Sequence, residues 1–264
     1  MVYRCAALSF SALSSKTFMQ RHRFYAAPNQ FSDLRVQLDN IQSHHLWRVL
    51  RLREGASVYV FDGLGKEWEC RVLSAGKGAA ELEIIQQLTT VVESPLQITL
   101  AQALIKNDRF EWIVQKTTEL GVTRIVPLMT MHSSILKAED RAEKQLQRWH
   151  RISLEALKQC GRRKLVEITE PISLENFCES REKGSTNLLF SECAGRRLNE
   201  IREGLPVNGK INLMIAAEGG WSDQELQTTE AFHFIPIHLG ARILRSETAA
   251  IVAVSLVQYL FGDL

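Results

Sequence analysis

From residue 96 to the C-terminus, short apolar runs alternate with longer segments of helical period, and this alternation limits the fold more than any other feature. We expect strands at 97–104, 124–128, 165–169, 187–191, 211–216 and 232–236. We expect helices at 107–120, about 140–160, 173–180, from 222, and about 246–261. An alternation of this kind predicts an α/β domain, a parallel sheet with helices on both faces, over residues 96–264.

The preceding part of the chain has a different period. Residues 57–61 alternate, meet the hairpin signal Asp62-Gly63 and continue into a second alternating run at 67–73. A further run lies at 80–85, and one helical segment is expected at 43–51. Several short strands with turn residues between them predict a small β-barrel over residues 20–92.

The first 18 residues contain no acidic residue and are rich in Ser and Ala. Residues 1–19 are therefore either a targeting segment for an organelle or an extension upstream of Met19, and we favour the extension. No apolar run approaches the roughly 20 residues of a membrane span. The cysteines are scattered without a CxxC pair or a histidine at ligand spacing, at Cys5, Cys70, Cys160, Cys178 and Cys193. We expect buried free thiols, no metal site and a cytoplasmic protein.

Two loops of the α/β domain are candidates for a ligand site, because ligands bind at the carboxyl ends of parallel strands. The first, 215–221, carries Gly219-Gly220, where backbone can approach a ligand closely or simply turn into the next helix. The second, 238–248, carries Arg242, Arg245 and Glu247, a cluster that either acts on a ligand or braces the loop. Motifs of dinucleotide-binding enzymes, P-loop NTPases and α/β-hydrolases are missing.

Basic residues gather on one side of the helix expected at 140–160. At 100° per residue the stripe comprises Arg141, Lys144, Arg148, Arg151, Lys158 and Arg162. Only Glu155 clearly interrupts it. RNA phosphates bind such stripes, although a solvated helix face looks the same. A second basic group lies in the barrel, at Arg21, Arg23, Arg48, Arg51 and Arg53.

These segments carry a resemblance to a known family. The motifs are HLWRVLR at 45–51, QKTTELGVTRIVP at 115–127, RWHRISLEALKQCGR at 148–162, AEGGW at 217–221 and LGARILRSETA at 239–249. In this order and spacing the sequence resembles the ribosomal RNA small subunit methyltransferase E family, 16S rRNA uridine-N3 methyltransferases of the SPOUT class. The likeness runs from about residue 21 to the C-terminus.

The resemblance implies a PUA-like N-terminal barrel and a SPOUT domain with a deep trefoil knot, a rare feature of protein chains. It also implies a homodimer, with S-adenosylmethionine as methyl donor. The cofactor-binding residues that it implies are Leu189, Ile215, Ala216, Gly219, Gly220, Leu239, Gly240, Ile243 and Leu244. The family usually has Gly-Pro where this chain has Ala216-Ala217, so the loop lacks the fixed φ of a proline.

The resemblance implies an enzyme that methylates N3 of a uridine in 16S rRNA and so takes part in ribosome biogenesis. The implied partner is the free rRNA or the 30S subunit. Arg245 is expected to stabilise the uridine anion, and Glu218 and Glu247 to act as base or orienting groups. The expected RNA contacts are Arg21, Arg23, Arg48, Arg51, Arg148, Arg151, Lys158, Gln159, Arg162 and Arg242. Two alternatives stay open: a non-catalytic ribosome-binding or assembly factor, and a SPOUT enzyme acting on another RNA base.

Overall fold

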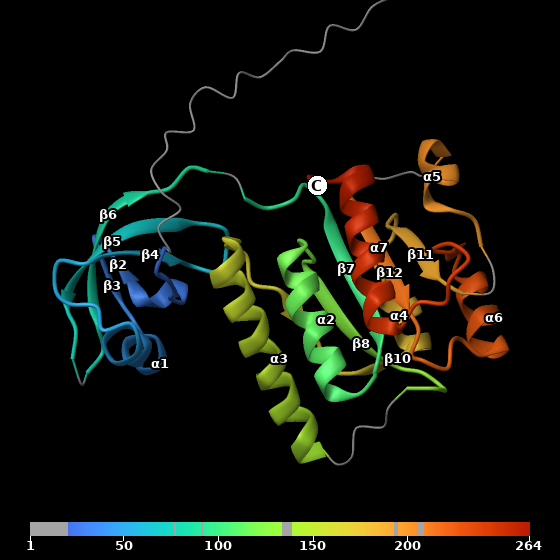
Figure 1. The fold of residues 1–264 in the computed structure, drawn as a ribbon, viewed down its shortest axis with the longest axis horizontal. Coiled ribbons are helices and arrows are strands. Elements are labelled where there is room, and N and C mark those ends of the chain that lie inside the picture. Colours follow the sequence, from blue (N-terminus) through green and yellow to red (C-terminus); the bar gives the residue numbers. More distant parts are fainter. Residues whose placement is uncertain (1–20, 77, 91, 134–138, 193–194, 205–208) are drawn as a thin grey trace, which may run out of the picture.

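The computed structural model describes residues 21–76, 78–90, 92–133, 139–192, 195–204 and 209–264. Figure 1 shows two parts side by side, a curved β-sheet domain and an α/β domain, with helix α3 facing the sheet domain. The expectation for residues 1–19 lies outside the described residues.

The N-terminal domain is one six-stranded sheet in the order β1-β4-β5-β6-β3-β2. Its strands are β1 (Arg23–Tyr25), β2 (Phe31–Ser32), β3 (Arg35–Gln37), β4 (Ser57–Phe61), β5 (Glu67–Ser74) and β6 (Glu81–Gln87). The expected hairpin is β4–β5, whose turn is closed by Asp62 Oδ1 accepting from the amides of Leu64 and Lys66 at 2.8 and 3.0 Å. The expected helix is α1 (Asn40–His44), which continues as a π-helical turn (His45–Val49).

The C-terminal domain is a seven-stranded sheet in which every pairing is parallel, in the order β10-β8-β7-β12-β11-β13 with β9 beside β8. The strands are β7 (Gln97–Ala103), β8 (Arg124–Met129), β9 (Glu167–Ile168), β10 (Ile172–Ser173), β11 (Thr186–Phe190), β12 (Lys210–Ile215) and β13 (Ile235–Ile237). The helices are α2 (Asn107–Glu119), α3 (Glu139–Cys160), α4 (Leu174–Ser180), α5 (Leu198–Ile201), α6 (Asp223–Ala231) and α7 (Ser246–Phe261).

Two apolar clusters, one on each face, confirm the predicted layers. On one face Phe110 of α2, Trp149 of α3 and Val254 of α7 pack in a single cluster with strand residues such as Leu100. On the other face α4 and α6 pack against alternate strand residues that include Ala101. The side chains of a strand point alternately to its two faces, so both sides of each strand are covered.

The apolar run predicted as a strand at 232–236 is shifted. Phe232 is the C-cap of α6, its amide donating to Thr228 O at 3.2 Å, and His233 takes a positive φ of 59° before β13 begins at Ile235. An apolar run at the end of a helix resembles the start of a strand in the sequence, because periodicity cannot distinguish a helix from a strand in so short a segment.

Cys70 and Cys178 are buried free thiols, whereas Cys160 is exposed, contrary to prediction. Burial raises the pKa of Cys70 to about 12 and that of Cys178 to about 11, so neither is a thiolate near neutral pH. Among the described residues, no group of three or more acidic, histidine or cysteine side chains is placed to hold a metal ion. No helix of that part combines the length and apolar character needed to cross a membrane.

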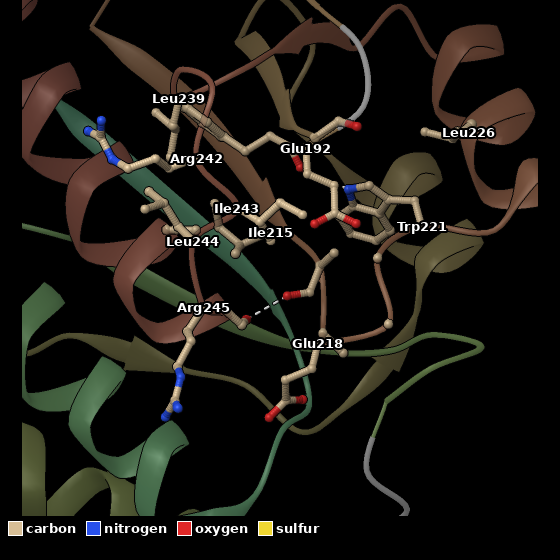
Figure 2. Close-up of a pocket in the computed structure, with 18 of the residues that line it drawn as sticks. Glu192, Ile215, Glu218, Trp221, Leu226, Leu239, Arg242, Ile243, Leu244 and Arg245 are labelled. Atoms are coloured by element: carbon tan, nitrogen blue, oxygen red, sulfur yellow. Dashed lines mark hydrogen bonds between the residues drawn. The ribbon is translucent and has the colours of Figure 1, made fainter.

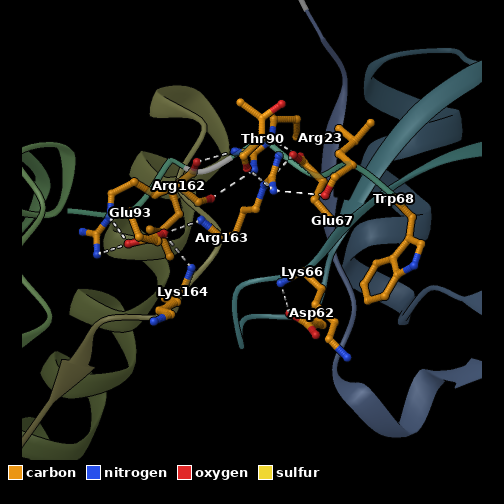
Figure 3. Close-up of polar contacts among 12 residues, drawn as sticks. Arg23, Asp62, Lys66, Glu67, Trp68, Thr90, Glu93, Arg162, Arg163 and Lys164 are labelled. Carbon is orange, nitrogen blue, oxygen red and sulfur yellow. Dashed lines mark hydrogen bonds and ion pairs between the residues drawn. The ribbon is translucent and has the colours of Figure 1, made fainter. Parts of the chain in front are cut away.

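A buried ionic cluster joins the two domains (Figure 3). Glu67 of β5 accepts from Arg23 Nε of β1 at 2.6 Å and, through its other oxygen, from Arg163 Nε at 3.0 Å. Arg23 also donates to Leu157 O at 2.6 Å and to Arg162 O at 3.0 Å, at the C-terminal end of α3. A cation at this end is favourable because free carbonyls and the helix dipole meet there.

Arg23 and Arg162 were predicted to contact RNA, and for both the prediction is wrong. Their exposed fractions are 8% and 5%. Arg162 pairs with Glu93 at 2.9 Å and donates to Thr118 O and Val122 O, at the end of α2. Their donors are engaged inside the protein and so do not face a phosphate.

Candidate functional site

A cavity of about 530 Å³ opens at the carboxyl ends of β11, β12 and β13, where the chain leaves the sheet (Figure 2). Its apolar walls include Ile215, Trp221, Leu239, Ile243 and Leu244. The size and the mix of apolar side chains with loop backbone are those of a pocket for a small organic ligand.

The first wall is the loop between β12 and α6. Ser222 caps α6, its hydroxyl accepting from Glu225 N at 3.3 Å. Gly220 has a φ of +72°, and a Cβ there would stand 3.3 Å from Glu192 Oε1. A Cβ on Gly219 would lie 2.7 Å from the ring of His132, which follows β8. The two glycines thus allow a tight turn with close neighbours on both sides.

The second wall is the loop between β13 and α7. Gly240 has a φ of +104°, and its amide donates to His238 Nδ1 at 3.1 Å. Ile243 is 79% exposed, although it is a large apolar side chain at the pocket. An exposed apolar side chain lining a cavity is suited to contact a ligand.

A buried chain of hydrogen bonds holds these two loops together. Gln102 Nε2, at the end of β7, donates to Ser246 Oγ at 2.9 Å. Ser246 Oγ in turn donates to Ala216 O at 2.5 Å. The start of α7 is therefore tied to the first residue after β12.

Eight of the nine predicted cofactor residues line the cavity: Ile215, Ala216, Gly219, Gly220, Leu239, Gly240, Ile243 and Leu244. Leu189 does not. It is 3% exposed and belongs to the apolar cluster beneath α4 and α6, while its neighbours from Phe190 to Glu192 line the cavity. The alternation of side chains along β11 turns Leu189 away from the pocket.

Of the predicted catalytic residues, Arg245 and Glu218 line the cavity and Glu247 does not. In Figure 2 the Arg245 guanidinium points away from the apolar walls. Neither Arg242 nor Arg245 makes an ion pair in the described part of the chain, so neither braces Glu247. Glu247 instead lies 4.0 Å from Arg109 of α2, which sequence reasoning missed.

Trp221 and Glu192 are further lining residues that the sequence did not single out. Trp221 Nε1 donates to Phe190 O at 2.9 Å, which fixes the indole ring across the pocket. Glu192 is exposed and faces the Trp221 side of the cavity in Figure 2. It comes two residues after the end of β11 and directly after the strand predicted at 187–191, and a carboxylate in that place was the available signal.

The predicted basic stripe is only partly a surface. Two residues of the stripe, Lys144 and Arg151, are exposed. Other predicted RNA contacts are exposed as well: Gln159 of α3, Arg21, Arg48 and Arg51 of the sheet domain, and Arg242 at the pocket. Lys158 has an 8% exposed side chain and pairs with Glu155 at 2.9 Å. Arg148 is half-exposed and pairs with Glu111 of α2. The side chain of Arg141 lies outside the described residues.

Comparison with known proteins accords with this geometry. Residues 38–85 match the RNA methyltransferase PUA domain family, and residues 92–258 match the RNA methyltransferase domain family. A ribosomal RNA small subunit methyltransferase E from Synechocystis sp. is 36% identical over 252 residues, 94% of this chain and 80% of that protein.

Two solved structures share the whole arrangement. One is a ribosomal RNA small subunit methyltransferase E from Neisseria gonorrhoeae bound to S-adenosyl methionine, with a TM-score of 0.85, 36% identity and coverage of 92% of this chain and 99% of that one. The other is a putative methyltransferase from Legionella pneumophila with bound SAM, with a TM-score of 0.84, 32% identity and the same coverage.

The sheet domain is therefore PUA-like, and the parallel-sheet domain is that of an RNA methyltransferase of the SPOUT class. Within that class, the chain belongs to the ribosomal RNA small subunit methyltransferase E family.

Proposed function

We propose that this protein transfers a methyl group from S-adenosylmethionine to N3 of a uridine in small-subunit ribosomal RNA. One observation carries the proposal: glycine-rich backbone and apolar side chains form a ligand-sized cavity beside Arg245, which makes no ion pair among the described residues. The family membership and the SAM-bound relatives support the choice of cofactor.

The residues of the cavity fit this cofactor. Ile215, Leu239 and Ile243 offer apolar contacts suited to an adenine ring, and the loops at Gly220 and Gly240 bring backbone close to polar atoms. Ala216-Ala217, in place of the usual Gly-Pro, is held by the hydrogen bond from Ser246 to Ala216 O, which supplies some of the rigidity that a proline would give. When bound, the cofactor supplies an electrophilic methyl group on a sulfonium.

The side chains have the charges that the acceptor requires. Uridine N3 carries a proton, so nucleophilic attack forms the N–C bond only as that proton leaves. Arg245 is assigned the stabilisation of the resulting negative charge on the uracil. Glu218, at the mouth of the pocket, is assigned the acceptance of the proton, directly or through water. Glu247 lies outside the cavity lining, and we assign it an orienting role.

We further propose that RNA is held by the exposed basic residues of both domains: Arg21, Arg48, Arg51, Arg151, Gln159 and Arg242, with Arg148 and Lys158 joining if their ion pairs open. The partner is small-subunit ribosomal RNA, free or in the 30S subunit. Arg21 and Arg48 stack over Tyr59 and Trp47 at 5.0 and 5.8 Å, which holds each cation at the surface.

A homodimer is proposed from the outer face of α7 and α2, which are in contact. Tyr259 is 70% exposed and Trp112 is 54% exposed there. Such apolar exposure on neighbouring helices is typical of an interface. Three further expectations stay predictions: the trefoil knot, the cytoplasmic location and the domain boundary at 92–96. The predicted boundary falls in the segment between β6 and β7.

The deciding experiment is mass spectrometry of nucleosides from purified 16S rRNA of cells with and without this gene, after digestion. Loss of 3-methyluridine, restored by the wild-type gene and not by Arg245→Ala, is the expected result. Unchanged 3-methyluridine with loss of another methylated base would favour a SPOUT enzyme for that base. An unchanged set of methylated nucleosides with a subunit-assembly defect would favour the non-catalytic factor.

A further inference from the structure

One arginine joins three segments at the mouth of the cavity. Arg109 lies in the first turn of α2, and its Nη1 donates to Glu218 Oε1 at 2.7 Å. Its Nε lies 4.0 Å from Glu247 Oε1. Glu218 belongs to the loop after β12 and Glu247 to the first turn of α7, so α2 is connected to both walls of the cavity.

The stability that these contacts provide is small. The side chains of Arg109 and Glu218 are 30% and 42% exposed, and water screens an ion pair at such a site. Glu247 is different, since its side chain is 13% exposed and its Oε2 is buried with no hydrogen-bond partner among the described residues. A buried carboxylate oxygen without a donor is unfavourable, so Glu247 depends on the nearby guanidinium.

We propose that Arg109 is a positioning residue for methyl transfer, acting through Glu218 and Glu247 to hold the two cavity loops at a fixed separation. The inference rests on the proposed function, because it concerns the same site. The buried chain Gln102–Ser246–Ala216 joins the same loops at their base. Arg109 joins them at the rim, beside the residue that we assign as proton acceptor.

The chemistry of the side chain explains why an arginine stands here. A guanidinium presents several N–H donors in a rigid plane and can serve two carboxylates at once. A lysine at the same place has one compact ammonium on a flexible stem, and would hold one carboxylate at a time. Substitution by lysine should therefore restore part of the function and substitution by glutamine none.

The first test uses the protein without RNA. Hydrogen exchange of residues 216–221 in the ligand-free protein should be faster in Arg109→Gln than in wild type, because a loop freed from its contact opens more often. S-adenosylmethionine affinity, measured by calorimetry, should weaken about three- to tenfold, because Arg109 does not line the cavity and acts on the cofactor only through the residues that it contacts. Arg109→Lys should fall between.

A double-mutant cycle makes the inference specific. If Arg109 acts through Glu218, then Arg109→Gln/Glu218→Gln should be no worse than the weaker-binding single variant. Lys116→Gln is the matched control, since Lys116 pairs with Glu119 on the same helix at 2.9 Å and with comparable exposure. That control should change neither exchange nor affinity.

Single-turnover methylation at saturating cofactor supplies the second readout. Arg109→Gln should lower the rate about 10- to 100-fold with the KM for RNA unchanged, as expected when reacting groups are misplaced by about an ångström. Additive effects of the two substitutions on S-adenosylmethionine affinity would overturn the inference. So would wild-type hydrogen exchange at residues 216–221 together with wild-type affinity in Arg109→Gln. If the wild type binds cofactor yet transfers no methyl group to uridine, the proposed function fails, while the exchange and affinity measurements still decide the role of Arg109.

Discussion

Glu67→Gln tests whether the buried ionic cluster holds the two domains together (Figure 3). Glu67 is 4% exposed and lies between two guanidiniums, that of Arg23 of the PUA-like domain and that of Arg163 of the methyltransferase domain. Glutamine keeps the shape and one carbonyl oxygen, but its amide N–H group would face an arginine N–H. Two buried cations would then lack their shared counter-charge.

The expected cost follows from this burial. Removing one partner of a buried pair costs about 3–5 kcal/mol, because the remaining charge is uncompensated. Native domains are stable by about 5–15 kcal/mol in all, so the loss is a large share. The carbonyls that accept from the arginines, such as Leu157 O and Thr90 O, remain and should keep the value near the lower end of the range.

Urea unfolding followed by tryptophan fluorescence and circular dichroism measures this loss. Because the cluster bridges the domains, we expect the single transition of the wild type to separate into two in Glu67→Gln, the tryptophans of each domain reporting its own unfolding. Glu69→Gln, two residues along the same strand, is the control: its partners Ser57 and Gln86 are exposed, and the change should stay within about 0.5 kcal/mol. A loss below about 1 kcal/mol with one transition would refute the coupling.

Four further predictions concern the pocket, the RNA surface, the dimer and pH. Gly220→Ala should weaken cofactor affinity in calorimetry by about tenfold, because its φ of +72° is unfavourable for alanine by about 1–2 kcal/mol, whereas Gly78→Ala, with open space around it, should change nothing. The double substitution Arg51→Gln/Arg151→Gln should reduce the slope of log RNA affinity against log salt concentration by about 2. Arg35 pairs with Glu81 at 2.6 Å, and Arg35→Gln should leave this slope unchanged. Tyr259→Glu should convert a dimer to a monomer in light scattering at micromolar concentration, whereas Ile41→Glu, at a site on α1 that is 77% exposed, should not; a wild-type monomer would count against the interface. Burial, and next the charge of Lys158, lower the pKa of His45, so the unfolded chain binds the proton more readily than the folded one. Stability should therefore fall as the pH drops below about 6.5, the pKa of an unperturbed histidine. His45→Asn should reduce that loss of stability, measured by thermal unfolding at several pH values.

The layers of the fold followed from the sequence because they depend on local patterns. Helix α7 lies where it was expected, and α2 and α3 begin and end within one residue of the prediction. The strands missed, β1 to β3 and β10, have two or three residues each. Alternation needs about four residues to be visible, so strands of this length leave no periodic signal.

The candidate site followed in outline, since two glycine-containing loops after apolar strands are visible in the sequence. The assignments within it failed where a side chain's neighbours mattered. The resemblance implies that Leu189 binds the cofactor, yet the alternation of side chains along β11 turns it into the core. The predicted basic stripe includes Arg162, which lies past the end of α3, where the helical angle no longer gives the side-chain direction.

The contacts that the sequence could not predict are those between distant residues. Glu67 and Arg163 are 96 positions apart, and Arg109 and Glu218 are 109 apart. In the first place two arginines share Glu67, and in the second Glu218 and Glu247 share Arg109. One bridge sets how the PUA-like domain sits against α3, and the other sets how the cavity loops sit against α2. Because the proposed RNA contacts lie in both domains, the position of one domain against the other sets how RNA reaches the cavity. A change at Glu67 should therefore lower methyl transfer without altering any residue of the cavity.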